Sequence, residues 1–189
     1  MGLNIRDIIP KKEISLQDLK GKIICVDAYN TLYQFLSSIR QPDGTPLMDN
    51  KKRITSHLSG ILYRNANLLA DGIKLVYVFD GIPPDLKGRT WEKRKQGREL
   101  AKAKYEEAKS EEDIAGMKRY GSQLIRLDEE MVKESKELLE AMGIGVVQAP
   151  SEGESEAAYL CKIKKEVYAS ASQDYDSLLF GAPKLIQNL

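Results

Sequence analysis

The chain has 189 residues, of which 42% are hydrophobic, so it is long enough to bury a sizeable core. Charged residues make up 30%, and 29 basic residues nearly balance 28 acidic ones. The balance excludes a protein that binds nucleic acid through a large overall positive charge, so any such affinity must come from local segregation of charge. No run approaches the roughly 18 consecutive apolar residues of a membrane-spanning helix, which predicts that the chain has no membrane partner.

The two cysteines, Cys25 and Cys161, lie in apolar contexts and lack the spacing of a metal site. With no signal peptide in the sequence, two isolated cysteines are typical of a reducing intracellular compartment.

Short apolar runs alternate with amphipathic segments along the chain. The runs are typical of buried parallel strands and lie at residues 23–26, 75–79, 145–149, 167–171 and 184–186. Helical spacing of apolar residues predicts helices at 28–39, 55–70 and 152–164. This alternation predicts an α/β fold with a mostly parallel, twisted sheet and helices on both faces.

A charged segment interrupts the alternation between the second and third predicted strands. From Lys87 to Lys109 it has nine basic residues against four acidic ones, and from Glu111 to Glu140 nine acidic against five basic. We expect one domain over residues 1–189 with a helical insertion at about 84–142, whose first part is too polar to be buried. A solvated charged hairpin without a binding role is the alternative interpretation.

Acidic residues follow the carboxyl ends of four predicted strands. They are Asp27, Asp80, Glu152, Glu154, Asp174 and Asp176. In an open parallel sheet these strand ends border the ligand site, so we expect the six carboxylates to share one crevice. Two like charges about 4 Å apart repel by on the order of 1 to 4 kcal/mol, which calls for raised pKa values or bound cations. Ligands that are all oxygen favour Mg²⁺, with Mn²⁺ as a substitute, and predict two-metal hydrolysis of phosphodiesters.

The same acids also have a purely structural interpretation. Ser151 and Glu154 have the spacing of a helix capping box, and Asp27 and Asp174 each stand where a helix N-cap is expected. When ions are bound, we expect Glu152 and Glu154 to point across the crevice towards Asp80 and Asp174. In a metal-free structure, we expect Glu154 to turn back to the cap.

Six motifs together resemble one known family of nucleases. They are Val26-Asp27-Ala28, Tyr33-Gln34-Phe35-Leu36, Thr55-Ser56-His57-Leu58, Val76-Tyr77-Val78-Phe79-Asp80-Gly81, Gln148-Ala149-Pro150-Ser151-Glu152-Gly153-Glu154 and Ala171-Ser172-Gln173-Asp174-Tyr175-Asp176. The chain resembles the structure-specific 5′-nuclease superfamily and is most similar to flap endonucleases of the archaeal type. The resemblance implies a Mg²⁺-dependent enzyme that cuts branched DNA near the junction of a 5′ flap, in replication and repair. It also implies that the six acids above are the metal ligands.

The resemblance gives roles to further residues. Lys87 and Arg94 match cations at the base of a helical arch that face the scissile phosphate, and ordinary surface charge is their alternative. Tyr33 matches an aromatic residue on which an unpaired base stacks, and packing in the core is its alternative. Further DNA contacts are implied at Arg40, Thr55, Arg64 and Gly2. His57, the one histidine, is expected to be structural.

Members of this family continue beyond the matched segment with a part that grips duplex DNA, a further carboxylate and a peptide that binds the sliding clamp. None of these is in the sequence, which predicts that the chain is the N-terminal portion of such a protein and that its own activity is weak. A cytoplasmic location is expected for an archaeal protein and a nuclear one for a eukaryotic protein.

Two other functions were weighed. Asp27-x-Tyr29-x-Thr31 resembles the nucleophile motif of haloacid-dehalogenase-like phosphohydrolases, but Tyr29 stands where that chemistry needs a second acid. A DNA-binding fragment without turnover is the other alternative.

Overall fold

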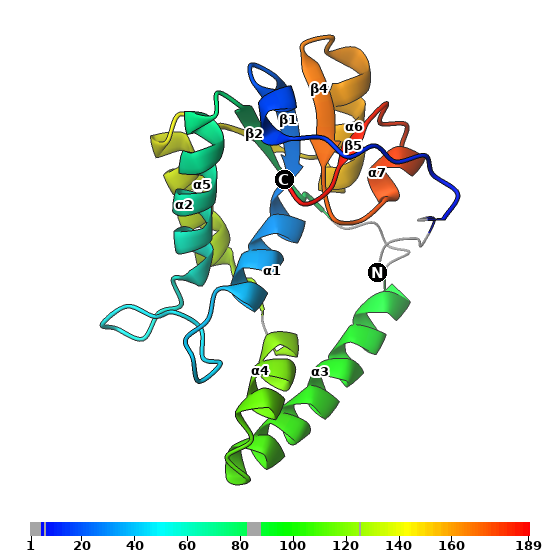
Figure 1. Cartoon of the computed structure of the whole chain (residues 1–189). Helices are drawn as coiled ribbons and strands as arrows, with labels where there is room; N and C mark the ends of the chain where they lie inside the picture. The colour runs from blue at the N-terminus through cyan, green and yellow to red at the C-terminus, as the bar shows by residue number, and fades with distance from the viewer. Residues whose placement is uncertain (1–4, 6, 83–87, 125) are drawn as a thin grey trace. The chain divides into compact units, whose positions relative to one another are not determined.

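A five-stranded parallel sheet forms the centre of the computed structural model, which describes residues 5, 7–82, 88–124 and 126–189 (Figure 1). The strands are β1 (Ile23–Asp27), β2 (Lys74–Phe79), β3 (Gly145–Gln148), β4 (Val167–Ala171) and β5 (Leu185–Ile186). Their order is β3-β2-β1-β4-β5, and every pairing is parallel. All five carboxyl ends therefore meet at the same edge, with β1 between β2 and β4.

The helices alternate with the strands in chain order. They are the 3-10 helix η1 (Leu16–Leu19) and α1 (Ala28–Ser38), α2 (Ser56–Ala70), α3 (Gly88–Ser110), α4 (Ile114–Gln123), α5 (Glu129–Ala141), α6 (Gly153–Ile163) and α7 (Asp176–Leu179). The predicted strands and helices are thus confirmed to within two residues at each end.

Side chains of β2 show that helices cover both faces of the sheet. Val78 packs into a buried cluster with Ala157 and Cys161 of α6. Tyr77, the residue before Val78, points to the opposite face of the sheet, where its hydroxyl donates a hydrogen bond of 2.9 Å to Asn65 of α2. The predicted α/β fold with helices on both faces is confirmed.

The chain divides into two compact units. Unit 1 consists of Met1–Thr31, Leu62–Pro83 and Lys136–Leu189 and contains the whole sheet. Unit 2 consists of Leu32–Ile61 and Pro84–Ser135 and contains α3 and α4. The expectation of one domain with a helical insertion stays a prediction.

The insertion begins with a hairpin of α3 and α4. Helix α3 carries the predicted excess of basic residues and exposes most of the side chains described beyond residue 95. Its small residues Ala101 and Ala108 are buried, and a methyl group added to Gly116 of α4 would lie 2.9 Å from Ala108 Cβ. Small side chains therefore allow two polar helices to pack closely.

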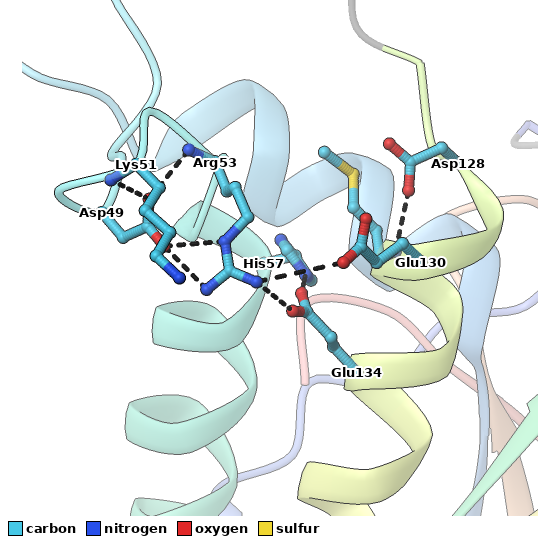
Figure 2. A network of polar contacts seen from close by, with 8 residues as sticks. Asp49, Lys51, Arg53, His57, Asp128, Glu130 and Glu134 are labelled. Carbon is cyan, nitrogen blue, oxygen red and sulfur yellow. Dashed lines mark hydrogen bonds and ion pairs between the residues drawn. The ribbon is translucent and has the colours of Figure 1, made fainter.

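An ion-pair network in unit 2 joins the α1–α2 connection to the first turns of α5 (Figure 2). The Arg53 guanidinium pairs with Asp49 at 2.8 Å and reaches Glu134 at 3.6 Å and Glu130 at 3.9 Å. His57 is fully buried, with Nε2 3.7 Å from Glu134 Oε2. We call these five residues the Arg53 network.

Among the described residues, none of the helices is both long and apolar enough to cross a membrane.

Candidate functional site

Asp27, the last residue of β1, is the most buried acid at the carboxyl edge of the sheet, with 6% of its surface exposed. Its Oδ1 accepts a hydrogen bond of 3.1 Å from the Asn30 N–H in the first turn of α1. Burial, against the effect of the Asn30 hydrogen bond and together with the negative charges of Asp80 and Asp174, raises the Asp27 pKa to about 7. Asp27 is therefore a helix cap and a member of an acidic cluster at the same time.

Asn30 connects two of the acids, and sequence analysis did not single it out. Its Nδ2 donates to Asp174 Oδ2 at 3.3 Å, and its Oδ1 accepts from the Gln173 N–H at 3.3 Å. Since its backbone N–H also binds Asp27, Asn30 fixes the loop after β4 beside the end of β1. Its place three residues after Asp27 was the only signal in the sequence.

Ser172, directly after β4, is a second residue that sequence analysis missed. Its hydroxyl donates to Glu154 Oε1 at 2.9 Å and lies 3.5 Å from Asp27 Oδ2, at the limit of a hydrogen bond. The same oxygen accepts from the Asp174 N–H at 3.2 Å. One small side chain thus contacts three acidic residues that come from three separate parts of the sequence.

Glu154 lies on α6 and shares the electrostatics of the cluster. Burial raises its pKa to about 7, and the charges of Asp27, Asp176 and Asp174 add to the rise, while the Ser172 hydrogen bond opposes it. Two carboxyl groups of the cluster therefore hold their protons to about neutral pH in the absence of a compensating cation.

The N-terminus of α6 holds the carboxylate of Asp80. The Gly153 N–H donates to Asp80 Oδ1 at 2.6 Å, where an anion also benefits from the helix dipole. A Cβ atom at residue 153 would lie 2.8 Å from that oxygen and 3.1 Å from the Val78 carbonyl. Glycine is required because the acid and the strand approach the helix backbone so closely.

The capping-box prediction for this helix is wrong. The N-cap of α6 is Glu152, not Ser151, and the Glu152 side chain makes no capping hydrogen bond. The expectation that Glu154 turns back to the cap is also wrong, because its carboxylate accepts from Ser172 and the first helical N–H binds Asp80. The predicted N-cap at Asp174 is wrong as well, since α7 follows the N-cap Tyr175.

The structure thus brings together five of the six predicted ligands. Asp27, Asp80, Glu154 and Asp174 are joined by hydrogen bonds or direct charge effects, and Asp176, the first residue of α7, raises the pKa of Glu154. Glu152 lies at the α6 N-cap, next to Gly153. In the described ranges no three acidic, His or Cys side chains are close enough to hold one metal ion as they stand. The oxygen ligands fit a hard divalent cation in chemistry, and side chains must rotate to close on it.

Tyr29 occupies the position at which the phosphohydrolase motif needs an acid. Its ring packs edge-on against Phe79, with the centroids 6.2 Å apart. The structure therefore does not favour that alternative.

The other predicted site residues lie in different settings. Tyr33 on α1 is 43% exposed while Phe35 and Leu36 are buried, so the core-packing alternative for Tyr33 is wrong. Thr55 precedes α2 and its N–H donates to the Leu47 carbonyl at 2.8 Å.

Two predicted DNA contacts make internal hydrogen bonds. Arg64 donates to the Leu189 carbonyl, through Nε at 2.9 Å. Arg40 donates to backbone carbonyls in unit 2. Gly2 and Lys87 lie outside the described residues, as does the side chain of Arg94, whose backbone belongs to α3.

Comparison with known proteins gives a consistent result. The chain is 58% identical over 189 residues to flap endonuclease 1 of Pyrococcus furiosus, and the alignment covers all of this chain and 55% of that protein. The flap endonuclease-1 structure from Methanococcus jannaschii matches with a TM-score of 0.74 and 45% identity, over 99% of this chain and 59% of that one. The catalytic core of Rad2 in complex with DNA substrate matches with a TM-score of 0.67 and 30% identity, over 93% and 46%.

These similarities confirm the predicted resemblance to archaeal flap endonucleases, and the chain spans about half the length of the curated relatives it matches. Two family models match: the XPG N-terminal domain over residues 4–101 and the XPG I-region over residues 143–189. Both regions of the family are present, and the acidic residues that each region contributes lie at the same edge of the sheet. This chain therefore belongs to the XPG family.

Proposed function

We propose that this chain is the metal-dependent catalytic part of a nuclease that hydrolyses phosphodiester bonds in DNA, near the junction of a 5′ flap with duplex. The observation that supports this most strongly is the cluster of acids at the carboxyl edge of the sheet, with the pKa values of Asp27 and Glu154 raised to about 7. Such repulsion is costly for a fold unless the site serves a cation. Relatives named flap endonuclease 1 and a neighbour in complex with DNA support the substrate class.

The acids would hold two Mg²⁺ ions, with Mn²⁺ as a substitute. The proposed ligands are Asp27, Asp80, Glu152, Glu154, Asp174 and Asp176. When bound, the ions lower the pKa of a water molecule and stabilise the charge on the attacking and leaving oxygens.

The protein's own contribution is to hold the acids in position. Asn30 fixes Asp174, Gly153 fixes Asp80, and Ser172 fixes Glu154. Each is a short contact from the backbone or from a small side chain next to a strand end, so the carboxylates are carried by rigid elements. Carboxylates held in fixed positions would bind a divalent cation selectively and orient the water or phosphate that the cation binds.

The residues proposed to contact DNA lie outside this cluster. Tyr33 exposes its ring, as stacking on an unpaired base requires, and such stacking contributes roughly 1 to 3 kcal/mol. Lys87 and Arg94 are proposed to neutralise charge at the scissile phosphate. The proposed biological role is in Okazaki-fragment maturation and base-excision repair. For a full-length protein of this kind, the proposal includes the sliding clamp as a partner.

The test is incubation with a labelled double-flap DNA in Mg²⁺ and in EDTA, beside a small phosphomonoester. We expect incision near the flap junction only with Mg²⁺ or Mn²⁺, and a loss of at least about 100-fold in Asp174→Asn, since such ions supply several kcal/mol to catalysis. Glu166→Gln removes an exposed acid before β4 and should cleave like the wild type. Phosphomonoester hydrolysis with intact DNA, or DNA binding without cleavage, would contradict the proposal.

A further inference from the structure

Arg40, two residues beyond the end of α1, places its guanidinium among backbone carbonyls of three segments. Its Nε donates to Ser37 O at 3.2 Å, Nη1 to Gly44 O at 2.7 Å and Nη2 to Gly121 O at 3.2 Å. All four residues belong to unit 2. The planar fork of donors thus joins α1, the turn at 41–44 and α4.

Two of these carbonyls lie in the last turns of helices. Ser37 belongs to the final turn of α1 and Gly121 to the final turn of α4. The last four carbonyls of a helix lack the usual helical partners, and the negative end of the dipole favours a cation there. Gly121 O also accepts from the N–H of the C-cap residue Leu124 at 3.3 Å, so Arg40 adds a second donor. One guanidinium therefore caps the C-termini of two helices.

A cavity lies beside this junction. Arg40, Gly44 and Gly121 line a cavity of about 400 Å³ together with Tyr105 of α3. A Cβ atom at Gly121 would lie 3.2 Å from the Tyr105 ring and 3.4 Å from Arg40 Nη1, so glycine leaves room for the guanidinium. Arg40 therefore supplies a side-chain hydrogen bond to the end of α4 at the edge of this cavity.

The partners of Arg40 differ from those of a phosphate-binding arginine. In the described part of the chain, no carboxylate lies within 4.0 Å of its guanidinium nitrogens. Partial burial lowers the Arg40 pKa, an effect that the nearby Tyr105 opposes. The positive charge is directed at carbonyl oxygens inside unit 2.

We propose that Arg40 is a positioning residue, which holds the α3–α4 hairpin against α1 by capping both α1 and α4, and that cleavage of DNA with a single-stranded arm depends on this attachment. The second half rests on the proposed function, in which Lys87 and Arg94 of the insertion act at the scissile phosphate of a flap substrate. The first half does not.

Hydrogen exchange of the free protein tests the attachment without any reference to activity. In Arg40→Gln we expect the amides in the last turn of α4 to exchange about tenfold faster, because its end loses its cap. Arg40→Lys should behave almost like Arg40→Gln, since a point charge cannot reach three carbonyls at once. Arg98→Gln removes the same charge from the exposed part of α3 and should leave α4 unchanged. Unchanged exchange in Arg40→Gln, or full protection in Arg40→Lys, would overturn the proposal.

Single-turnover cleavage at saturating enzyme tests the consequence. We expect both Arg40 variants to lower the cleavage rate of a long 5′ flap about tenfold, with flap affinity within about twofold of wild type. A loss of affinity and of its salt dependence that lysine restores would instead make Arg40 a phosphate contact and refute the positioning role. If the wild type does not cleave, the proposed function fails, and the exchange measurement still decides whether Arg40 attaches α4.

Discussion

Two groups of acids in this molecule have opposite electrostatics. In the Arg53 network, Asp49 accepts hydrogen bonds from the backbone and side chain of Arg53, which lower its pKa. At the carboxyl edge of the sheet, burial and neighbouring acids raise the pKa values of Asp27 and Glu154 to about 7. The Arg53 network contains its own cation, whereas the charges that act on Asp27 and Glu154 at the sheet edge are those of other acids.

The largest contrast should come from the same substitution made in both groups. Asp27→Asn keeps a residue that caps helices well but removes a charge that neighbouring acids repel. The rise of roughly three units in the Asp27 pKa corresponds to a destabilisation of the folded protein by the ionised carboxylate of about 4 kcal/mol at most. We expect a gain on the order of 2 kcal/mol in the free energy of unfolding at pH 8 in EDTA, with cleavage reduced at least about 100-fold. Asp49→Asn should lower stability slightly and leave cleavage unchanged. Urea titrations measure both, and a loss of stability in Asp27→Asn would remove the contrast.

Divalent cations should affect stability in a pH-dependent way. The folded protein binds more protons than the unfolded chain between the ordinary carboxyl pKa values near 4 and the raised values of about 7. Stability in EDTA should therefore fall as pH rises through this window and stay low above it.

Because Mg²⁺ relieves the same repulsion, we expect 10 mM Mg²⁺ to add about 1 to 2 kcal/mol at pH 8 and clearly less at pH 5.5. Thermal unfolding with and without Mg²⁺ at the two pH values measures this difference. An equal effect at both values would show that the ion binds elsewhere.

A methyl group at Gly153 should disturb the sheet edge without changing any charge. Gly153→Ala places Cβ 2.8 Å from Asp80 Oδ1, so the carboxylate must move away from the helix N-terminus. We expect a loss of about 1 kcal/mol in stability and about tenfold in the single-turnover cleavage rate.

Gly97→Ala is the matched control, because nothing lies within 4 Å of its added Cβ and alanine favours the helix. It should be neutral or slightly stabilising. Wild-type cleavage by Gly153→Ala would show that the position of Asp80 has no importance for the reaction.

The smallest effect concerns His57 in the Arg53 network. Burial lowers its pKa, and the charges of Glu134 and Asp128 oppose this, with Arg53 and Glu130 nearby. Neither ring nitrogen has a hydrogen-bond partner in the described structure. Since the unfolded chain binds the proton more readily, the contribution of His57 to stability is lost as pH falls through the ordinary value of about 6.5.

We therefore expect His57→Asn to lose less stability than wild type between pH 7 and pH 5, by under about 1 kcal/mol. Urea titrations across this range, in EDTA, compare the two slopes. A steeper acid dependence in the variant would mean that the Glu134 charge, not burial, dominates at His57.

The sequence predicted the sheet and the convergence of its acids because both depend on regular patterns. Apolar runs identify buried parallel strands, and parallel strands bring their carboxyl ends to one edge. The partners of the acids follow no such pattern. Asn30 reaches Asp174 across 144 positions in the sequence, and Ser172 contacts Glu154 across 18. Nothing near an asparagine or a serine in the sequence reveals a contact of that kind.

The errors at α6 have a related cause. A capping box is a local pattern, and Ser151 and Glu154 satisfy it in the sequence. In the structure, Asp80 from another strand takes the first N–H of the helix, and Ser172 takes the carboxylate that would have closed the box. Tertiary contacts between charged groups outweighed a local motif worth about 1 kcal/mol.

The parallel pairing of β1 with β4 also has a consequence for how the protein is made. β1 is complete at residue 27, but its partner β4 begins at residue 167, so the long segment between them must leave the ribosome before the two can pair. Pairing across so large a separation is slow, because a long loop has to close first. During synthesis Asp27 and Asp174 remain apart, so the part of the repulsion that comes from the acids after β4 arises only when β4 joins the sheet. The acids that follow β4 therefore join the cluster after those that follow β1 and β2, so the proposed cation site is complete only once β4 has paired with β1.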